Sequence, residues 1–213
     1  MNQINTEQLI DLLRVMAEEI LAAKDQLTEL DAAIGDGDLG VTMTLGFRAI
    51  QQALQETADL DISGVFSKCG MAFADHAAST FGALMSTMFT RAARTVKGKE
   101  LITPIEAAEI LSAATEGVQQ RGKAQLGDKT VLDAMIPARD AMNKAVQGGA
   151  NLQDALDAAL QAARQGAEDT IALKSKAGRS GWLGDRTVGV KDPGAAAFVL
   201  LLSSAKKYLD KML

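Results

Sequence analysis

The chain of 213 residues contains only one cysteine, Cys69, and only one histidine, His76. A single cysteine excludes an internal disulfide framework and fits a reducing, cytoplasmic compartment, where we expect Cys69 to be a small core residue. Both residues lie in the same predicted helical region, so they cannot form a Ser/His/Asp or Cys/His catalytic arrangement. Covalent catalysis by such a group is therefore not expected.

The sequence also lacks long apolar runs and an excess of basic residues. The N-terminus, MNQINTEQLI, has no basic segment followed by an apolar run, so no secretory signal is expected. No stretch reaches the roughly 18 apolar residues of a membrane span. The formal net charge of −5 argues against a nucleic-acid surface, which needs a basic face. Neither nucleic acid nor a membrane is expected as a partner.

Aromatic residues make up only 4% of the chain, whereas hydrophobic residues of all kinds make up 47%. The apolar residues are mainly Ala, Leu, Ile and Met, which favour helices because they lose little entropy on entering one. No stretch alternates for long with the two-residue period of a strand, and no segment resembles a linker. We therefore predict an all-α fold with one domain over residues 1–213, an antiparallel bundle or barrel.

Several predicted helices have recognisable ends. Asn5 is a candidate N-cap of the first helix, and the next helix is expected to begin at about Val41. Residues 63–94 predict two helices, or one that breaks near HAASTFG. The sequence TPIE at 103–106 predicts a capping box with proline in the first turn.

Four segments interrupt the helical pattern with glycine and polar residues. They are residues 34–42, 79–82, 122–130 and 178–194. If the helices alternate in direction, loops separated by two helices share one end of the bundle. The four segments are therefore candidates for a single site.

The first of these segments contains GDGDLG, in which Asp36 and Asp38 lie among three glycines. A dinucleotide fingerprint needs a preceding strand, and an EF-hand needs glutamate where Phe47 stands, so neither motif fits. On extended backbone Asp36 and Asp38 would point to one side, and Asp31 can join them from the end of the first helix. Clustered carboxylates repel one another unless a divalent cation neutralises them. The pattern favours a Mg²⁺–phosphate site at a helix N-terminus over the alternative, a solvated Asp/Gly turn.

The segment GKAQLGDKT at residues 122–130 differs from a P-loop because Asp128 precedes Lys129 and no strand comes before it. Two interpretations remain open. Either Asp128 or Thr130 caps the next helix, or the loop contacts a nucleotide.

The last segment is long and glycine-rich, which is typical of functional or disordered loops. Arg179 is a candidate phosphate ligand, since guanidinium groups donate charge-assisted hydrogen bonds to phosphate. Trp182 either covers the core or contacts a ligand. Asp192 either caps the final helix or holds a nucleoside.

Taken together, GDGDLG, GDKTVLDAMIPA and GRSGWLGDRTVGVKDPGA resemble the nucleotide-binding DhaL domain of dihydroxyacetone kinases, the DAK2-type domain. The motifs occur in family order, and the resemblance covers nearly the whole chain. It implies an eight-helix antiparallel barrel with a nucleotide and two Mg²⁺ ions in the loops at one end. The family's usual GDGDHG reads GDGDLG here, with Leu39 in place of histidine.

By that resemblance, the metal ligands and catalytic residues correspond to Asp31, Asp36 and Asp38, with Arg179 as a further catalytic residue. The implied nucleotide-binding residues are Leu39, Gly40, Val41, Thr42, Met43, Ser79, Thr80, Gly82, Gly122, Thr130, Val131, Arg179, Asp192, Pro193 and Gly194.

The resemblance implies a phosphotransferase subunit with ADP or ATP and Mg²⁺ as cofactors. In the bacterial phosphotransferase-linked system such a domain stands alone at about this length. It keeps ADP as a coenzyme that a phosphohistidine protein rephosphorylates, and the phosphate then passes to a small ketose on a substrate-binding subunit. The free-standing subunit is the closer match, because this chain carries no substrate domain; a homodimer is also allowed. The alternatives are a nucleotide-binding regulatory module without phosphoryl transfer, and an ATP-dependent kinase subunit for another small sugar.

Overall fold

The computed structural model describes residues 2–55 and 60–212, except for the side chain of Arg179. Within these residues it contains nine α-helices and two 3-10 helices, and its only strand-like pairing is an isolated bridge between Ile4 and Ile102. The prediction of an all-α fold is confirmed. The helices are α1 (Thr6–Ala22), α2 (Lys24–Ala32), α3 (Leu39–Ala53), α4 (Ile62–His76), α5 (Thr80–Thr95), α6 (Pro104–Gly122), α7 (Leu132–Gln147), α8 (Leu152–Asp169), η1 (Thr170–Ala172), η2 (Arg179–Thr187) and α9 (Pro193–Lys211).

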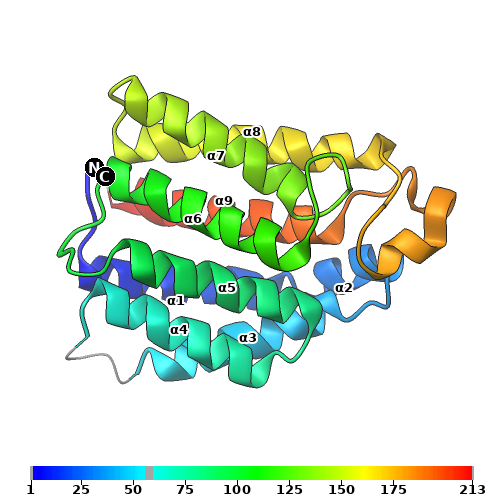
Figure 1. The fold of residues 1–213 in the computed structure, drawn as a ribbon. Coiled ribbons are helices and arrows are strands. Elements are labelled where there is room, and N and C mark those ends of the chain that lie inside the picture. Colours follow the sequence, from blue (N-terminus) through cyan, green and yellow to red (C-terminus); the bar gives the residue numbers. More distant parts are fainter. Residues whose placement is uncertain (1, 56–59, 213) are drawn as a thin grey trace.

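Eight of the described helices form a closed ring. Each of α1 and α3 to α9 packs against the next of these helices along the chain, and α9 returns to α1. Successive helices of the ring run in opposite directions, so that their loops alternate between the two ends of the molecule (Figure 1). The predicted antiparallel eight-helix barrel is confirmed.

The short helix α2 is an addition to the ring and packs against α3 and α9. Only Ala23 separates it from α1, so the expected continuous first helix is broken there. The helix that was expected to begin at about Val41 begins at Leu39. The expected N-cap of α1 is present, because Asn5 accepts a hydrogen bond from the amide of Gln8 at 2.9 Å.

Apolar side chains fill the ring. The rings of Phe47 and Phe73 are fully buried and meet edge to face, with centroids 5.7 Å apart. Cys69 lies in the same core, as expected, and burial raises the pKa of its thiol to about 12. A cavity of about 220 Å³ with an almost wholly apolar lining lies among α1 and α4 to α9. Among the described residues, no helix combines the length and the apolar character that crossing a membrane requires.

The capping box at the start of α6 is present as predicted. Glu106 accepts hydrogen bonds from the hydroxyl and the amide of Thr103 and, at 2.9 Å, from the ammonium of Lys99. The bond from Thr103 and then that from Lys99 lower the pKa of Glu106 from 4.5 to about 2. The folded-state pKa is therefore below the unfolded value. The stabilisation that follows is complete above about pH 4.5 and is lost as the pH falls toward 2.

Glu106→Gln is expected to lower the free energy of unfolding at pH 7 by about 1 kcal/mol, the usual effect of weakening a helix cap. The difference from the wild type should shrink as the pH falls from 4.5 to 2. Urea denaturation at a series of pH values measures it, with Glu116→Gln at an exposed position of α6 as the control. A difference that stays constant down to pH 2 would contradict this account.

Candidate active site

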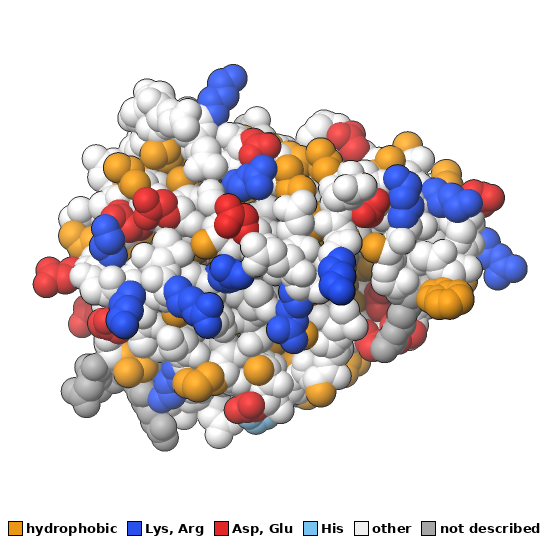
Figure 2. All heavy atoms as spheres, in the orientation of Figure 1, with side chains coloured by type: hydrophobic (Ala, Val, Ile, Leu, Met, Phe, Trp, Pro, Cys, Tyr) orange, Lys and Arg blue, Asp and Glu red, His pale blue; other side chains and the backbone are white. Residues whose placement is uncertain are grey.

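A cavity of about 230 Å³ lies at the end of the barrel where α3, α5, α7 and α9 begin. Its wall contains residues from all four segments that interrupt the helical pattern, so the inference that they share one end is borne out. Acidic side chains gather at this end in Figure 2, below the segment that joins α8 to α9. The predicted site residues in the wall are Asp31, Asp36, Asp38, Leu39, Ser79, Thr80, Gly122, Thr130, Val131, Asp192, Pro193 and Gly194.

Four helix N-termini meet at this cavity. The first residues of the four helices, which all belong to the cavity wall, are Leu39, Thr80, Leu132 and Pro193. A helix N-terminus carries partial positive charge and backbone N–H groups without helical partners, which suits phosphate. The backbone at this end of the barrel therefore favours anions, although the nearby side chains are acidic.

Three of those acidic side chains form a cluster. One carboxylate oxygen from each of Asp31, Asp36 and Asp38 lies within 4.8 Å of the other two. Asp31 is buried and accepts a hydrogen bond from the amide of Leu39 at 3.1 Å. Burial and the charge of Asp31 raise the pKa of Asp38. Oxygen ligands at this spacing fit Mg²⁺, and a divalent ion would remove the repulsion among the carboxylates.

A turn brings the aspartates together, in place of the extended backbone that the sequence suggested. Gly37 has φ +74°, and Asp38 lies in the helical region with φ −91° and ψ −9°. A Cβ atom at Gly35 would lie 2.5 Å from Oδ1 of Asp31. A side chain at Gly37 would strain the backbone, and one at Gly35 would push the carboxylate of Asp31 out of its place in the cluster.

Among the implied nucleotide-binding residues whose side chains the structure describes, five do not line the cavity: Gly40, Val41, Thr42, Met43 and Gly82. Successive residues of a helix point about 100° apart, so Leu39 alone of the run 39–43 faces the cavity. Val41 is 45% exposed, whereas Met43 is fully buried in the core.

Thr42 and Gly82 instead hold a residue of the cavity wall. The hydroxyl of Thr42 donates a hydrogen bond to Oγ of Ser79 at 3.1 Å, and the same oxygen accepts one from the amide of Gly82 at 3.0 Å. These two residues therefore fix the position of Ser79 at the start of α5.

The loop that joins α6 to α7 is held by a residue that the sequence analysis missed. Asp133 is 3% exposed, and its two carboxylate oxygens accept hydrogen bonds from the amides of Gly127 and Thr130, both at 2.7 Å. Its place three residues after Thr130 is a spacing typical of carboxylates that return to a loop amide. Lys129, which lies between Gly127 and Thr130 in the sequence, was not predicted as a site residue either.

The hydrogen bonds of Asp128, Thr130 and Asp192 decide which of these residues contact the start of a helix. Asp128 accepts a hydrogen bond from the amide of Gln125 at 2.9 Å and does not cap α7, whereas the hydroxyl of Thr130 accepts one from Leu132, the first residue of α7. Asp192 caps α9 through the amide of Ala195 at 2.7 Å. Burial raises the pKa of Asp192 to about 7.

Two predictions concern the segment between α8 and α9. Trp182 is 93% exposed, so the interpretation that it covers the core is wrong. The side chain of Arg179 lies outside the part of the chain that the structure describes.

Asp133→Ala is expected to lower the free energy of unfolding by about 2–3 kcal/mol, because two loop amides lose their acceptor. Hydrogen exchange at Gly127 and Thr130 should accelerate. The control is Asp140→Ala at an exposed position of α7, where urea denaturation should show a change below about 0.5 kcal/mol. Equal effects of the two substitutions would show that the loop amides do not depend on Asp133.

Comparison with known proteins identifies the family. The model of the DAK2 domain family matches residues 33–207. The ADP-binding subunit DhaL of the PEP-dependent dihydroxyacetone kinase of Escherichia coli K12 is 30% identical, over 93% of this chain and 95% of its own. The corresponding subunit of dihydroxyacetone kinase 2 of Listeria innocua is 33% identical, over 94% and 93%.

A solved structure with the same fold is that of the native dihydroxyacetone kinase of C. freundii. It has a TM-score of 0.74 and 25% identity, and the match covers 96% of this chain but only 35% of that kinase. This chain thus spans about a third of that protein. The chain belongs to the DAK2 domain family, as a DhaL-type member of the dihydroxyacetone kinases, which are phosphotransferases.

Proposed function

We propose that this chain is the ADP- or ATP-binding subunit of a kinase for dihydroxyacetone or a related small ketose, with residues 1–213 as one nucleotide-binding domain. The observation that carries the proposal is that three clustered carboxylates and four helix N-termini share one cavity. A nucleoside diphosphate with Mg²⁺ fits both features, since helix N-termini bind phosphates and carboxylates bind the cation. The ADP-binding subunits among its relatives support the same assignment.

The three aspartates are the proposed metal ligands and would hold two Mg²⁺ ions, which neutralise phosphate charge when bound. Backbone groups at the starts of α3, α5 and α9 would bind phosphates, and the side chain of Arg179 would donate to the transferred phosphoryl group. Phe81, Leu84 and Val118 give the cavity an apolar wall that suits a nucleobase.

Phosphoryl transfer depends on positioning and electrostatics, so the chain needs no covalent nucleophile of its own. Cys69 is buried, and His76 is exposed at the end of α4, so neither lines the cavity. In the proposed relay a phosphohistidine protein of the phosphotransferase system supplies the phosphate. A ketose on a separate substrate-binding subunit receives it, and this chain holds the nucleotide between the two.

The surface around the cavity suits contact with such partners. Leu126, Trp182 and Val188 are 55%, 93% and 49% exposed; Leu126 lies in the loop before α7, Trp182 in η2 and Val188 directly after η2. Exposed apolar side chains beside a cavity are available for contact with a protein partner. A substrate-binding subunit must reach this end, because the phosphate has to leave the cavity there.

Two measurements test the proposal. Calorimetric titration of the nucleotide-free chain with ADP, with and without Mg²⁺, measures binding. A coupled assay with phosphoenolpyruvate, the phosphotransferase proteins, the substrate-binding subunit and dihydroxyacetone measures transfer.

We expect Mg²⁺-dependent ADP binding, and ketose phosphate formed from phosphoenolpyruvate with ADP in catalytic amount. Turnover with ATP alone would instead assign an ATP-dependent kinase. Binding without turnover from either donor would assign a regulatory module. Absence of Mg²⁺-dependent nucleotide binding would contradict all three assignments.

A further inference from the structure

Lys129 is among the most deeply buried large side chains that the structure describes, with 1% of its surface exposed. Lysine is almost never fully buried unless its charge is satisfied. The backbone of Lys129 also has φ +60°, in the left-handed region that residues other than glycine rarely adopt. Both features are unfavourable, so the contacts of Lys129 must offset them.

The ammonium group of Lys129 donates hydrogen bonds to three backbone carbonyl oxygens. The acceptors are Leu173 at 3.0 Å, Thr187 at 2.5 Å and Val190 at 2.6 Å. An ammonium group has three protons, so these bonds satisfy all of its donors. Without the cation, three carbonyl oxygens would converge on one buried point with no donor between them.

These three carbonyls belong to the two ends of the segment that joins α8 to α9. Leu173 precedes η2, whereas Thr187 and Val190 lie at its end and beyond it. The hydroxyl of Thr187 accepts a hydrogen bond from the amide of Ser175 at 2.9 Å and so links the same two ends. In Figure 1 the segment, drawn in orange, projects beyond the helix ring.

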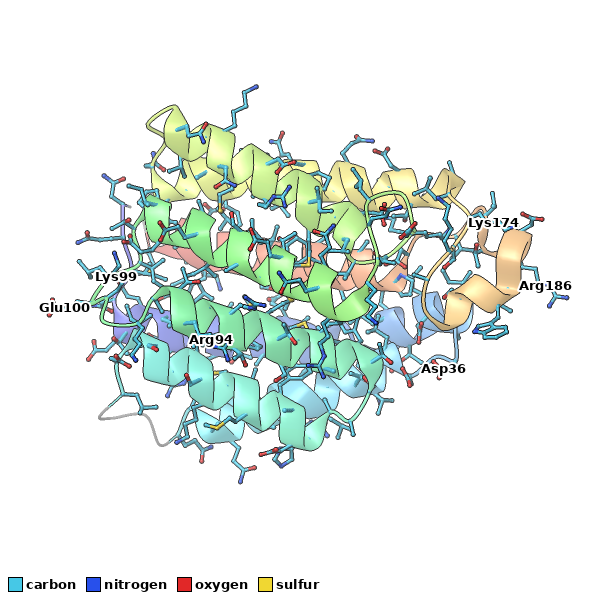
Figure 3. The ribbon with its side chains drawn as sticks, viewed as in Figure 1. Asp36, Arg94, Lys99, Glu100, Lys174 and Arg186 are labelled. Carbon is cyan, nitrogen blue, oxygen red and sulfur yellow. The ribbon has the colours of Figure 1, made fainter. Side chains whose placement is uncertain are left out.

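Between those ends the segment forms one side of the cavity. Its residues in the cavity wall are Ala177, Gly178 and Ser180. Labelled residues of the same segment, Lys174 and Arg186, lie at the same end of the molecule as Asp36 (Figure 3). The bonds of Lys129 thus join the two ends of a segment whose first half, at Ala177, Gly178 and Ser180, faces the ligand space.

We propose that Lys129 is a positioning residue that fastens residues 173–190 as one wall of the nucleotide cavity and thereby slows nucleotide release. The effect on release rests on the proposed function, whereas the fastening is a property of the chain alone. A neutral side chain at this position would remove three of the hydrogen bonds that hold the two ends of the segment together and would leave the bond between Ser175 and Thr187. The carboxylate cluster lies elsewhere in the wall, so the requirement for Mg²⁺ should remain.

The test compares substitutions in one loop. Lys129→Met keeps the side-chain length without charge or donors, and Lys129→Gln keeps two donor protons. Lys123→Met is the matched control, because Lys123 lies in the same loop with φ +52° but is exposed. Two measurements without nucleotide show how firmly residues 173–190 are held. They are the hydrogen exchange of these residues and the fluorescence anisotropy of Trp182, the only tryptophan. Stopped-flow fluorescence with an ADP analogue and Mg²⁺ measures the rate at which the nucleotide is released.

We expect faster exchange and lower Trp182 anisotropy in both Lys129 variants but not in Lys123→Met. Release should accelerate by about tenfold or more in Lys129→Met and by less in Lys129→Gln. The helical circular dichroism signal and the Mg²⁺ concentration needed for binding should not change.

Unchanged exchange in Lys129→Met would overturn the fastening, and a loosened segment with an unchanged release rate would overturn its link to retention. Loss of the helical signal in both Lys129 variants would show that the whole fold needs Lys129. That result would also overturn the proposal. If the wild type binds no ADP, the proposed function fails, while exchange and anisotropy still decide whether Lys129 fastens the wall.

Discussion

Asp36→Asn is expected to weaken Mg²⁺-dependent ADP binding by about 100-fold or more, because it removes one of three charges that would hold the cation. Asp36 is exposed, and its carboxylate belongs to a cluster whose oxygens lie within 4.8 Å of one another. Asparagine has the same shape as aspartate but no charge, so the loss would be electrostatic. Calorimetric titration with ADP at several Mg²⁺ concentrations measures it.

The control for this prediction is Asp25→Asn, an equal change of charge at an exposed position of α2 outside the cluster. The free energy of unfolding should change by less than about 0.5 kcal/mol in both variants, as is usual for surface substitutions. If Asp36→Asn binds ADP with Mg²⁺ as tightly as Asp25→Asn does, the cluster is not the metal site.

Gly82→Ala is expected to lower the free energy of unfolding by about 1–3 kcal/mol, the usual range for an added group in packed structure. Its Cβ would lie 1.9 Å from the carbonyl oxygen of Ala77. That oxygen accepts a hydrogen bond from the amide of Ser79 at 2.8 Å, so moving it would disturb the turn between α4 and α5. Because Ser79 belongs to the cavity wall, nucleotide affinity should fall as well.

Gly122→Ala provides the comparison within the same end of the barrel. A Cβ there would meet only Leu84, at 3.8 Å, and alanine favours a helix by up to about 1 kcal/mol over glycine. Thermal and urea denaturation should therefore find Gly122→Ala as stable as the wild type or more so. Equal stability of Gly82→Ala and Gly122→Ala would refute the close approach of α5 to the preceding turn.

Helix-capping residues and glycine-containing breaks made much of the fold predictable from the sequence. Asn5 and the pair Thr103 and Glu106 are typical helix starts, and polar residues with glycine marked the break between α4 and α5. Alternation of helix direction then brought four distant loops to one end without any contact being known. The break at Ala23 was not predictable, because neither glycine nor proline marks it and the residues around it favour a helix.

The site was predictable in its composition but not in its geometry. The clustering of Asp36 and Asp38 followed from their spacing, although a turn at Gly37 produces it instead of extended backbone. Helical periodicity places the side chain of Met43 in the core, so any contact of that residue with a nucleotide would have to come from its backbone. Lys123 and Lys129 are the same residue type in one loop, and only the tertiary fold distinguishes the exposed lysine from the buried one.

The central claim is that divalent ions lie between the three aspartates and the phosphates of a nucleotide in this cavity. A crystal structure with ADP and Mn²⁺, which replaces Mg²⁺ and scatters anomalously, tests it most directly. The account predicts anomalous peaks about 2.0–2.2 Å from oxygens of Asp31, Asp36 and Asp38, with ADP phosphates at the starts of α3 and α5. ADP bound in the cavity with no metal near these aspartates would contradict it.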